Sequence, residues 1–353
     1  MISRSDSQWM FFYQLGRFGE AKTIDHYAAH SKDASELRSI LYKSEERKIK
    51  GISPQAPGKF MAFRENSKKM LVLGNCQASN IARQIAAATD LSVLGMEVMN
   101  YQSEKDIFLE LIESVDYIAC CLLSPNFEEI ATQNLRKRDD LNILFYCPMF
   151  FDGIHPDIVY WGGMGQRVAS GAGDYHSRLV LNSYFAEKSE KECLDILNVN
   201  TYQNIGYFDE FDHSFKEMER REQGCDIAFR PFLLENIRQK NCFLTVNHPT
   251  QLFLNHMSAE ICRYFDIDFQ KTDYNAVHST LAAGPQWPIV PEIIEHFNLA
   301  YSNGNSFQIQ GSVMGWEEFI ARSYILYDQI GRDKLWSMGN EGQKLILKRG
   351  LNA

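Results

Sequence analysis

The chain has 353 residues, of which 45% are hydrophobic and 23% are charged, and its net charge at pH 7 is −9. This acidic balance argues against a general nucleic-acid binder, because phosphate binding depends on clustered Lys and Arg. A chain of this length can bury a full core, so we expect one large domain with appendages, or two domains.

Neither the N-terminus nor any later segment has the pattern of a signal peptide or a membrane span, so we expect a cytoplasmic bacterial protein. The eight cysteines are spread along the chain, several inside apolar runs, and no two form a CxxC pair. This usage is typical of reduced, buried thiols rather than of disulfides or a zinc site, and we expect no metal.

Residues 1–55 are predicted to form a small helical preface with a helix-turn-helix pattern. We interpret it as a docking or dimerisation element, through which the chain could form a homo-oligomer. The segment "GISPQAPGK" then has the prolines and glycines of a linker.

From Lys69 onward, apolar strand-like runs alternate with helix-like runs. The predicted strands are "KMLVLG", "LSVLGMEVM", "YIACCLL" and "NILFYCPMFF". A capping box from Ser103 to Asp106 is predicted to open the helix after the second strand. This alternation predicts an α/β domain over 69–300 with a Rossmann-like or flavodoxin-like, mostly parallel sheet.

Beyond Phe151 the pattern becomes less regular. A Gly-rich segment, "DGIHPDIVYWGGMGQRVASGAGDYHSR", predicts a long structured loop. Helices are predicted around 179–197 and 214–240, followed by a strand, a turn at His248-Pro249 and an amphipathic helix. Residues 301–353 are predicted to be a helical C-terminal extension.

Cys76 lies where the first predicted strand ends and a helix begins. A helix N-terminus favours thiolate over thiol, and strand-to-helix junctions of parallel sheets gather reactive groups. Gly74 would allow a tight turn there, while Asn75 and Gln77 would supply donors for an oxyanion. The pattern predicts a cysteine nucleophile elbow. The alternative is that Cys76 is a small residue that only packs.

A cysteine nucleophile needs a base, and three histidines lie in loops after predicted strands. His155 has Asp152 and Asp157 beside it, His176 lies in "GDYHSR", and His248 lies in "TVNHPT". Each could instead have a structural role, and the residues alone do not choose among them.

The segments "LVLGNCQAS", "FFDGIHPD", "DYHSR" and "NHPT" resemble those of the WcbI-type polysaccharide biosynthesis family, acetyltransferases of bacterial capsule assembly. The resemblance covers about 69–300. It implies a coenzyme A (CoA) ligand, an acetyl group as cargo and a sugar hydroxyl as acceptor. By matching motif, Cys76 would be the nucleophile and His155 the base, with Asp157 or Asp152 as its partner.

A looser likeness connects the chain to SGNH-type hydrolases, which use an Asp-x-x-His pair such as Asp152 to His155. Here Cys76 replaces the serine, and the pair lies in the middle of the chain. A cysteine-based esterase or thioesterase is therefore the first alternative. The second is a non-catalytic carbohydrate-binding or assembly protein.

CoA carries a 3′-phosphate and a pyrophosphate, which call for Arg, Lys or helix N-termini. The candidates in the Gly-rich loop are Arg167, His176 and Arg178, with Arg83 as a weaker one. An aromatic cluster could line a pantetheine channel or stack on a sugar, or could belong to the core; its members are Phe150, Phe151, Tyr160 and Trp161.

Overall fold

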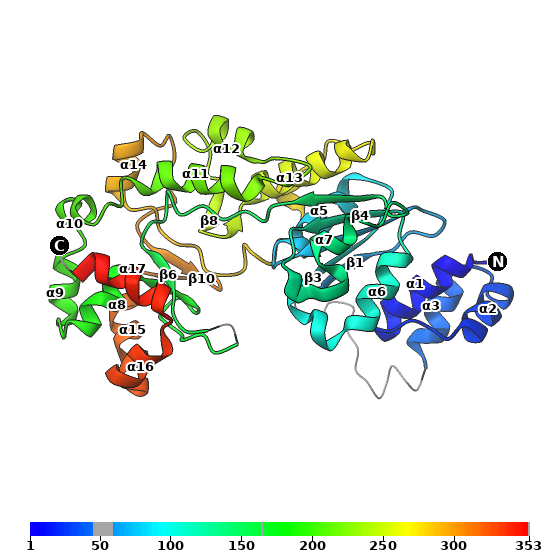
Figure 1. The fold of residues 1–353 in the computed structure, drawn as a ribbon, viewed down its shortest axis with the longest axis horizontal. Helices are drawn as coiled ribbons and strands as arrows, with labels where there is room; N and C mark the ends of the chain where they lie inside the picture. The colour runs from blue at the N-terminus through cyan, green and yellow to red at the C-terminus, as the bar shows by residue number, and fades with distance from the viewer. Residues whose placement is uncertain (45–58, 164, 352–353) are drawn as a thin grey trace. The chain divides into compact units, whose positions relative to one another are not determined.

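The computed structural model describes residues 1–44, 59–163 and 165–351. They belong to two compact units (Figure 1). The first unit comprises Met1–Pro148, Glu222–Phe229 and Gln251–Ser279, and the second comprises Met149–Arg221, Arg230–Thr250 and Thr280–Ala353. This grouping differs from the expected division at 55, 69–300 and 301–353, since each unit combines segments that are distant in sequence. Residues 51–58 of the predicted linker lie outside the described residues.

The first unit contains a five-stranded sheet in the order β1-β3-β2-β4-β5. Its strands are β1 (Lys59–Ala62), β2 (Lys69–Gly74), β3 (Ser92–Glu97), β4 (Tyr117–Cys121) and β5 (Ile143–Tyr146). The last four are parallel and confirm the predicted strands, whereas the antiparallel edge strand β1 was not predicted. The chain leaves β2 first for β3 on one side and then for β4 on the other. Ligands of open parallel α/β sheets bind at the carboxyl ends of the strands beside such a switch point, which here is the end of β2.

Helices pack on the sheet of the first unit. They are α5 (Ala78–Ala88), α6 (Lys105–Glu113), α7 (Thr132–Leu135) and α13 (Gln251–Tyr264), with 3₁₀ turns η1 (Val98–Ser103), η2 (Pro125–Ile130) and η3 (Tyr274–Ala276). Helix α5 approaches β3 so closely that a Cβ at Gly95 would lie 2.7 Å from the Ala78 carbonyl oxygen. Helix α13 lies along α5, where the Ser258 hydroxyl donates to the Ile81 carbonyl at 3.1 Å. Both contacts fix the helix that begins beside Cys76.

The predicted capping box is wrong. Helix α6 begins after Glu104, which makes no side-chain cap, and the Ser103 hydroxyl donates to the Asn100 carbonyl at 2.9 Å. Residues 98–103 form a 3₁₀ turn first, and that turn uses the Ser103 side chain.

The N-terminal helices are α1 (Arg4–Leu15), α2 (Ala21–His30) and α3 (Ala34–Tyr42), and they lie beside α6 in Figure 1. They have an apolar cluster of their own, which includes Phe11 and Leu37. A buried ion pair, Lys69 Nζ to Asp6 Oδ1 at 2.9 Å, joins α1 to β2. Residues 4–42 of the predicted preface thus contain three helices that belong to the first unit, whereas residues 45–55 lie outside the described residues.

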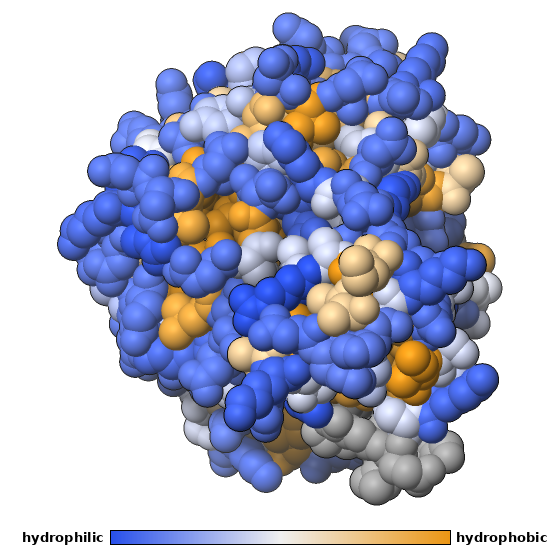
Figure 2. Space-filling model, turned by 90° about the vertical axis from the view of Figure 1, so that its right-hand side faces the viewer, coloured by the Kyte–Doolittle hydropathy of each residue, from blue (hydrophilic) through white to orange (hydrophobic). Residues whose placement is uncertain are grey.

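Figure 2 shows one face of the molecule, on which most side chains are hydrophilic and apolar side chains show in smaller areas between them. A docking or dimerisation role of residues 1–55 stays a prediction. Among the helices of the described ranges, none combines the length and the apolar character needed to span a membrane.

The second unit is mainly helical with small two-stranded sheets. Its helices are α8 (Arg178–Phe185), α9 (Glu190–Asp195), α10 (Val199–Asn204), α11 (Glu210–Glu222), α12 (Arg230–Asn236), α14 (Pro291–Phe297), α15 (Trp316–Ile330), α16 (Arg332–Met338) and α17 (Glu341–Leu351). Its strands are β6 (Ile158–Tyr160), β7 (Tyr175–Ser177), β8 (Phe243–Thr245), β9 (His248–Pro249), β10 (Phe307–Ile309) and β11 (Ser312–Met314). The last residue of α11 is grouped with the first unit.

The helices predicted around 179–197 and 214–240 each form two separate helices. Gly224, in the left-handed region with φ of 86°, follows the end of α11 and turns the chain away from the helix. The Gly-rich segment predicted as a structured loop contains the hairpin strands β6 and β7.

Candidate functional site

Cys76 lies between β2 and α5, at the switch point of the sheet, and is half-buried. The turn is held by Asn75, whose Oδ1 accepts the Gln77 N–H at 3.0 Å and whose carbonyl accepts the Ala78 N–H at 2.9 Å. The Gln77 N–H, expected as an oxyanion donor, therefore serves the turn. The N–H groups of Asn80 and Ile81 also serve the helix, since both donate to the Gln77 carbonyl, at 3.0 and 2.9 Å. In the first turn of α5 this leaves the Ser79 N–H as a donor.

Gly74 is required for a reason other than the expected one. Its φ is not positive, and a Cβ at this position would lie 2.5 Å from the Tyr146 hydroxyl oxygen. That buried hydroxyl donates to the Leu73 carbonyl at 3.2 Å. Gly74 thus leaves room for Tyr146 beneath the elbow.

The charge environment of Cys76 also differs from the expectation. Burial raises the pKa of the Cys76 thiol to about 12, and the negative charge of Glu97 adds to this rise, while the Cys76 backbone N–H acts in the opposite direction. The resting sulfur is a thiol rather than the thiolate that a helix N-terminus alone would favour.

Glu97 is a site residue that the sequence interpretation missed. It is the last residue of β3 and pairs in register with Gly74 of β2, so it lies at the same carboxyl-end edge as Cys76. Burial raises its pKa, which makes the carboxylate a stronger base than an exposed one. The available signal was a polar residue ending a buried strand.

His155 belongs to the second unit and is 1% exposed. Burial lowers its pKa to about 4, and the backbone groups near its ring are those of Phe243 and Pro288. Neither predicted partner is bonded to it: Asp152 accepts from the Ser214 hydroxyl, and Asp157 accepts from the Leu179 N–H and the Tyr207 hydroxyl. The expected His155–aspartate pair is absent from this part of the described chain.

His176 has a structural role in the second unit. Its Nδ1 lies 2.7 Å from the Tyr327 hydroxyl and its Nε2 lies 3.0 Å from the Val168 carbonyl oxygen. The carbonyl can only accept, so Nε2 carries the proton and Nδ1 accepts from the tyrosine. Burial lowers the pKa of His176 to about 4, so the ring is neutral and does not suit a phosphate.

His248 is held by Tyr175, whose hydroxyl lies 3.0 Å from Nε2 and donates to Asn247 Oδ1 at 2.7 Å. Because the Tyr175 hydroxyl has one hydrogen, Nε2 of His248 donates and Nδ1 is left as an acceptor. That Nδ1 is buried with no partner among the described side and main chains. Burial lowers the pKa of His248 to about 4.

A cavity of about 480 Å³ in the second unit gathers three of the polar site residues predicted from the sequence, Asp152, Arg167 and Arg178. We call it the arginine pocket; its polar lining is Asp152, Tyr160, Arg167, Arg178, Glu210 and Gln343. Arg167 stacks on Tyr160 with 4.1 Å between the guanidinium carbon and the ring centre. The pocket thus combines two cationic and two anionic side chains.

The remaining candidates are divided between this pocket and other parts of the molecule. Arg83 stacks on Phe60 of β1, 4.4 Å from the ring centre, which gives it a packing role. Of the predicted aromatic cluster, Phe150 and Tyr160 line the arginine pocket, whereas Phe151 and Trp161 are fully buried in the core.

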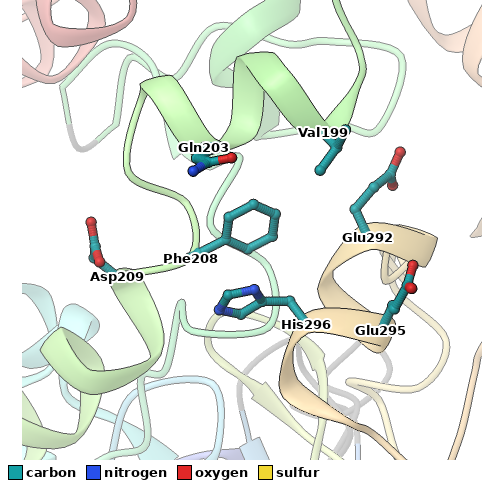
Figure 3. A pocket seen from close by; sticks show the side chains of 7 residues that line it. All are labelled: Val199, Gln203, Phe208, Asp209, Glu292, Glu295 and His296. Carbon is teal, nitrogen blue, oxygen red and sulfur yellow. The ribbon is translucent and has the colours of Figure 1, made fainter.

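A further cavity of about 770 Å³ in the second unit has a different character (Figure 3). The Phe208 ring stacks on His296 with 4.2 Å between ring centres, and three carboxylates surround them, from Asp209, Glu292 and Glu295. No residue predicted from the sequence lines it. Across the described ranges, no three His, Cys, Asp or Glu side chains gather as a metal site requires, and the absence of a metal stays a prediction.

Comparison with known proteins gives one family and one solved structure. The family described as polysaccharide biosynthesis enzyme WcbI matches residues 69–270. A structure of WcbI, described as a novel polysaccharide biosynthesis enzyme in its native form without a disulfide bond between CoA and one of its cysteines, matches with a TM-score of 0.60. The sequences are 19% identical, and the match covers 81% of this chain and 99% of that chain. No curated protein matches the chain.

Proposed function

Because the chain belongs to the WcbI family of polysaccharide biosynthesis enzymes, we propose that it transfers an acetyl group from acetyl-CoA to a sugar hydroxyl of a bacterial polysaccharide or its precursor. The observation that carries this proposal is the half-buried Cys76 at the switch point of the sheet, with Glu97 beside it. The solved relative, whose description mentions CoA and one of its cysteines, supports CoA as the donor.

The proposed reaction begins with transfer of the Cys76 proton to the Glu97 carboxylate. This transfer also neutralises the charge that raises the thiol pKa. The sulfur then attacks the thioester carbonyl, the bond from that carbon to the CoA sulfur breaks, and CoA leaves as its thiol with the proton from Glu97. One thioester replaces another, so the acetyl-enzyme forms with little change in free energy and stays reactive.

In the second half of the reaction a sugar hydroxyl attacks acetyl-Cys76. Its proton passes to Glu97, the carbon–sulfur bond breaks, and Cys76 regains the proton. The negative oxygen that develops would be stabilised by the Ser79 N–H in the first turn of α5 and by the Asn75 amide nitrogen. We assign the base to Glu97 rather than His155, since Glu97 belongs to the same unit as the thiol and His155 is enclosed in the other.

Intact-protein mass spectrometry after brief incubation with acetyl-CoA tests this proposal. We expect one added acetyl group on the wild type and none on Cys76→Ala. Glu97→Gln should form the adduct at least about tenfold more slowly, as expected for loss of a general base. Cys225→Ala is the matched control, because Cys225 is the other half-buried cysteine of the first unit.

The two alternatives predict different results. An esterase or thioesterase would hydrolyse acyl esters without CoA. A non-catalytic carbohydrate-binding protein would form no adduct, and its ligand binding would not change in Cys76→Ala. Absence of an adduct, together with no thermal stabilisation by CoA, would contradict the transferase proposal.

A further inference from the structure

Arg178 is the most unusual charged residue of the second unit. It is 7% exposed, and its Nε and Nη2 have no hydrogen-bond partner among the described residues. A guanidinium keeps its charge at all ordinary pH values, and the nearby negative charges of Asp157 and Glu210 stabilise the charge of Arg178. Its Nε–H and Nη2–H groups nevertheless lack an acceptor, and buried donors without an acceptor are costly. An anion with two oxygens would satisfy both donors.

The position of Arg178 is well fixed. Its backbone N–H donates to the Asp157 carbonyl at 2.7 Å, and its guanidinium stacks on the Tyr207 ring at 4.5 Å. The Tyr207 hydroxyl in turn donates to Asp157. The side chain is therefore held in place before any ligand arrives, with its guanidinium lining the arginine pocket.

The two unpartnered nitrogens define the geometry of the ligand. Nε and Nη2 lie on the same edge of the guanidinium, and this edge matches two oxygens of a carboxylate or phosphate. Asp157 and Glu210 lie close enough to stabilise the charge of Arg178, but neither accepts a hydrogen bond from this edge. The anion that fits is therefore one that enters the pocket from solution.

The rest of the lining limits the charge of that ligand. Asp152 and Glu210 balance Arg167 and Arg178, so the pocket has no excess positive charge for a group with several negative charges, such as the phosphates of CoA. Carboxylates are good acceptors for sugar hydroxyls, and the half-buried Phe150 offers an apolar surface to the face of a pyranose ring.

We propose that the arginine pocket binds a pyranose sugar that carries a single anionic group, a carboxylate or a phosphate ester, held on the free edge of Arg178. This inference rests on the proposed function, because it takes the bound sugar to be the acceptor of the acetyl group. It replaces the expectation that Arg167 and Arg178 hold the phosphates of CoA.

Saturation-transfer NMR and calorimetry on the full chain would test the proposal with four probes: glucuronate, glucose 6-phosphate, glucose and CoA. We expect glucuronate or glucose 6-phosphate to bind at least about tenfold more tightly than glucose, as charge-assisted pairing with arginine predicts. The two anions together tell a carboxylate from a phosphate ester, and binding of either one supports the proposal.

Arg178→Gln should abolish this preference for the anion, and Arg167→Gln should reduce it. Because Arg178 is buried, its variant could lose stability; the less buried Arg167 provides the second test. Arg332→Gln is the matched control, since Arg332 stacks on Tyr184 at 5.2 Å in the same unit but outside the pocket. Retained anion preference in both folded pocket variants would overturn the proposal.

Two further results would also overturn it: no binding of either anionic sugar, or loss of CoA binding in Arg178→Gln, which would assign the pocket to the donor. Acetyl-adduct formation on Cys76 is measured separately. If the adduct is absent while the anionic sugar still binds in an Arg178-dependent way, the proposed transferase reaction fails and the pocket assignment stands.

Discussion

Burial at the carboxyl edge of the sheet makes ionisation of both Cys76 and Glu97 less favourable, and the negative charge of Glu97 adds to this effect on Cys76. Such a pair is unreactive at rest and becomes reactive when a proton can move from sulfur to carboxylate. This arrangement limits oxidation of the thiol when no substrate is bound, since thiolates react faster than thiols.

Gly74→Ala should destabilise the protein by about 1–3 kcal/mol, because its Cβ would overlap the Tyr146 hydroxyl. Tyr146→Phe should restore most of that loss in the double variant, since the remaining ring atom lies at ordinary contact distance, 3.5 Å. Urea denaturation measures both effects. Gly163→Ala, with no atom within 4 Å of its added Cβ, is the control. Additive losses in the double variant would contradict the explanation.

At the residue scale, the sequence predicted where Cys76 lies but not its ionisation. The apolar run before Gly74 and the Ala-rich run after Gln77 define the junction. The pKa of Cys76 depends on Glu97, a residue 21 positions away that sheet pairing brings close. The predicted hydrogen bond between His155 and Asp152 or Asp157 is absent for a related reason. The two aspartates accept hydrogen bonds from residues of other elements instead, namely Ser214, Leu179 and Tyr207.

Helix α1 is joined to the sheet by charges that are almost completely enclosed. Asp6 is 0% exposed and Lys69 is 5% exposed, and Asp6 also accepts the Asn66 N–H at 3.0 Å. Removal of one partner of such a pair leaves the other charge buried without compensation.

Asp6→Asn should therefore lower the free energy of unfolding by about 3–5 kcal/mol. Asp25→Asn, which breaks the exposed pair of Arg4 and Asp25, should cost less than about 1 kcal/mol. Chemical denaturation of the two variants measures the difference. Equal losses would show that the buried pair contributes no more than a surface pair.

At the element scale, the four parallel strands were predictable because each is a short, continuously apolar run. Strand β1 was missed because every residue of it is only half-buried, and its pairing with β3 is not encoded in a local pattern. The structure has a mixed α/β fold with a mainly parallel sheet. The more specific assignment as Rossmann-like, flavodoxin-like or SGNH-like stays a prediction.

Over the whole molecule, three enclosed histidines stand out: His155 and His176, which are buried, and His248, which is half-buried. Burial lowers the pKa of each to about 4, below the usual value in an unfolded chain, so the unfolded state binds more protons between these limits. Their contribution to stability is fully present above about pH 6.5 and is lost as the pH falls toward 4.

We expect the free energy of unfolding to fall by up to roughly 4 kcal/mol per pH unit near pH 5, if all three histidines contribute. Denaturation series at several pH values measure this slope. His176→Gln should reduce the slope by about a third, whereas His213→Gln, which changes an exposed histidine, should not. A stability that stays constant between pH 6.5 and 5 would contradict the prediction.

The division of the molecule was the least predictable feature. Composition and linker patterns predict domains that are continuous in sequence. Each compact unit instead consists of three segments, and the segments of the two units alternate along the chain. Arg178 shows the same limit: its sequence neighbours gave no sign that Tyr207 would hold it or that its Nε would lack a partner.

The interleaved segments also have a consequence for synthesis on the ribosome. Helix α13 covers α5, yet Gln251 emerges 103 residues after Pro148, a delay of roughly 5–20 s at ordinary translation rates. During that interval α13 is not yet available to cover the apolar side of α5, to which Ile81 and Ile85 belong. A nascent chain in this state would depend on chaperones, and a chain truncated at Pro148 would aggregate.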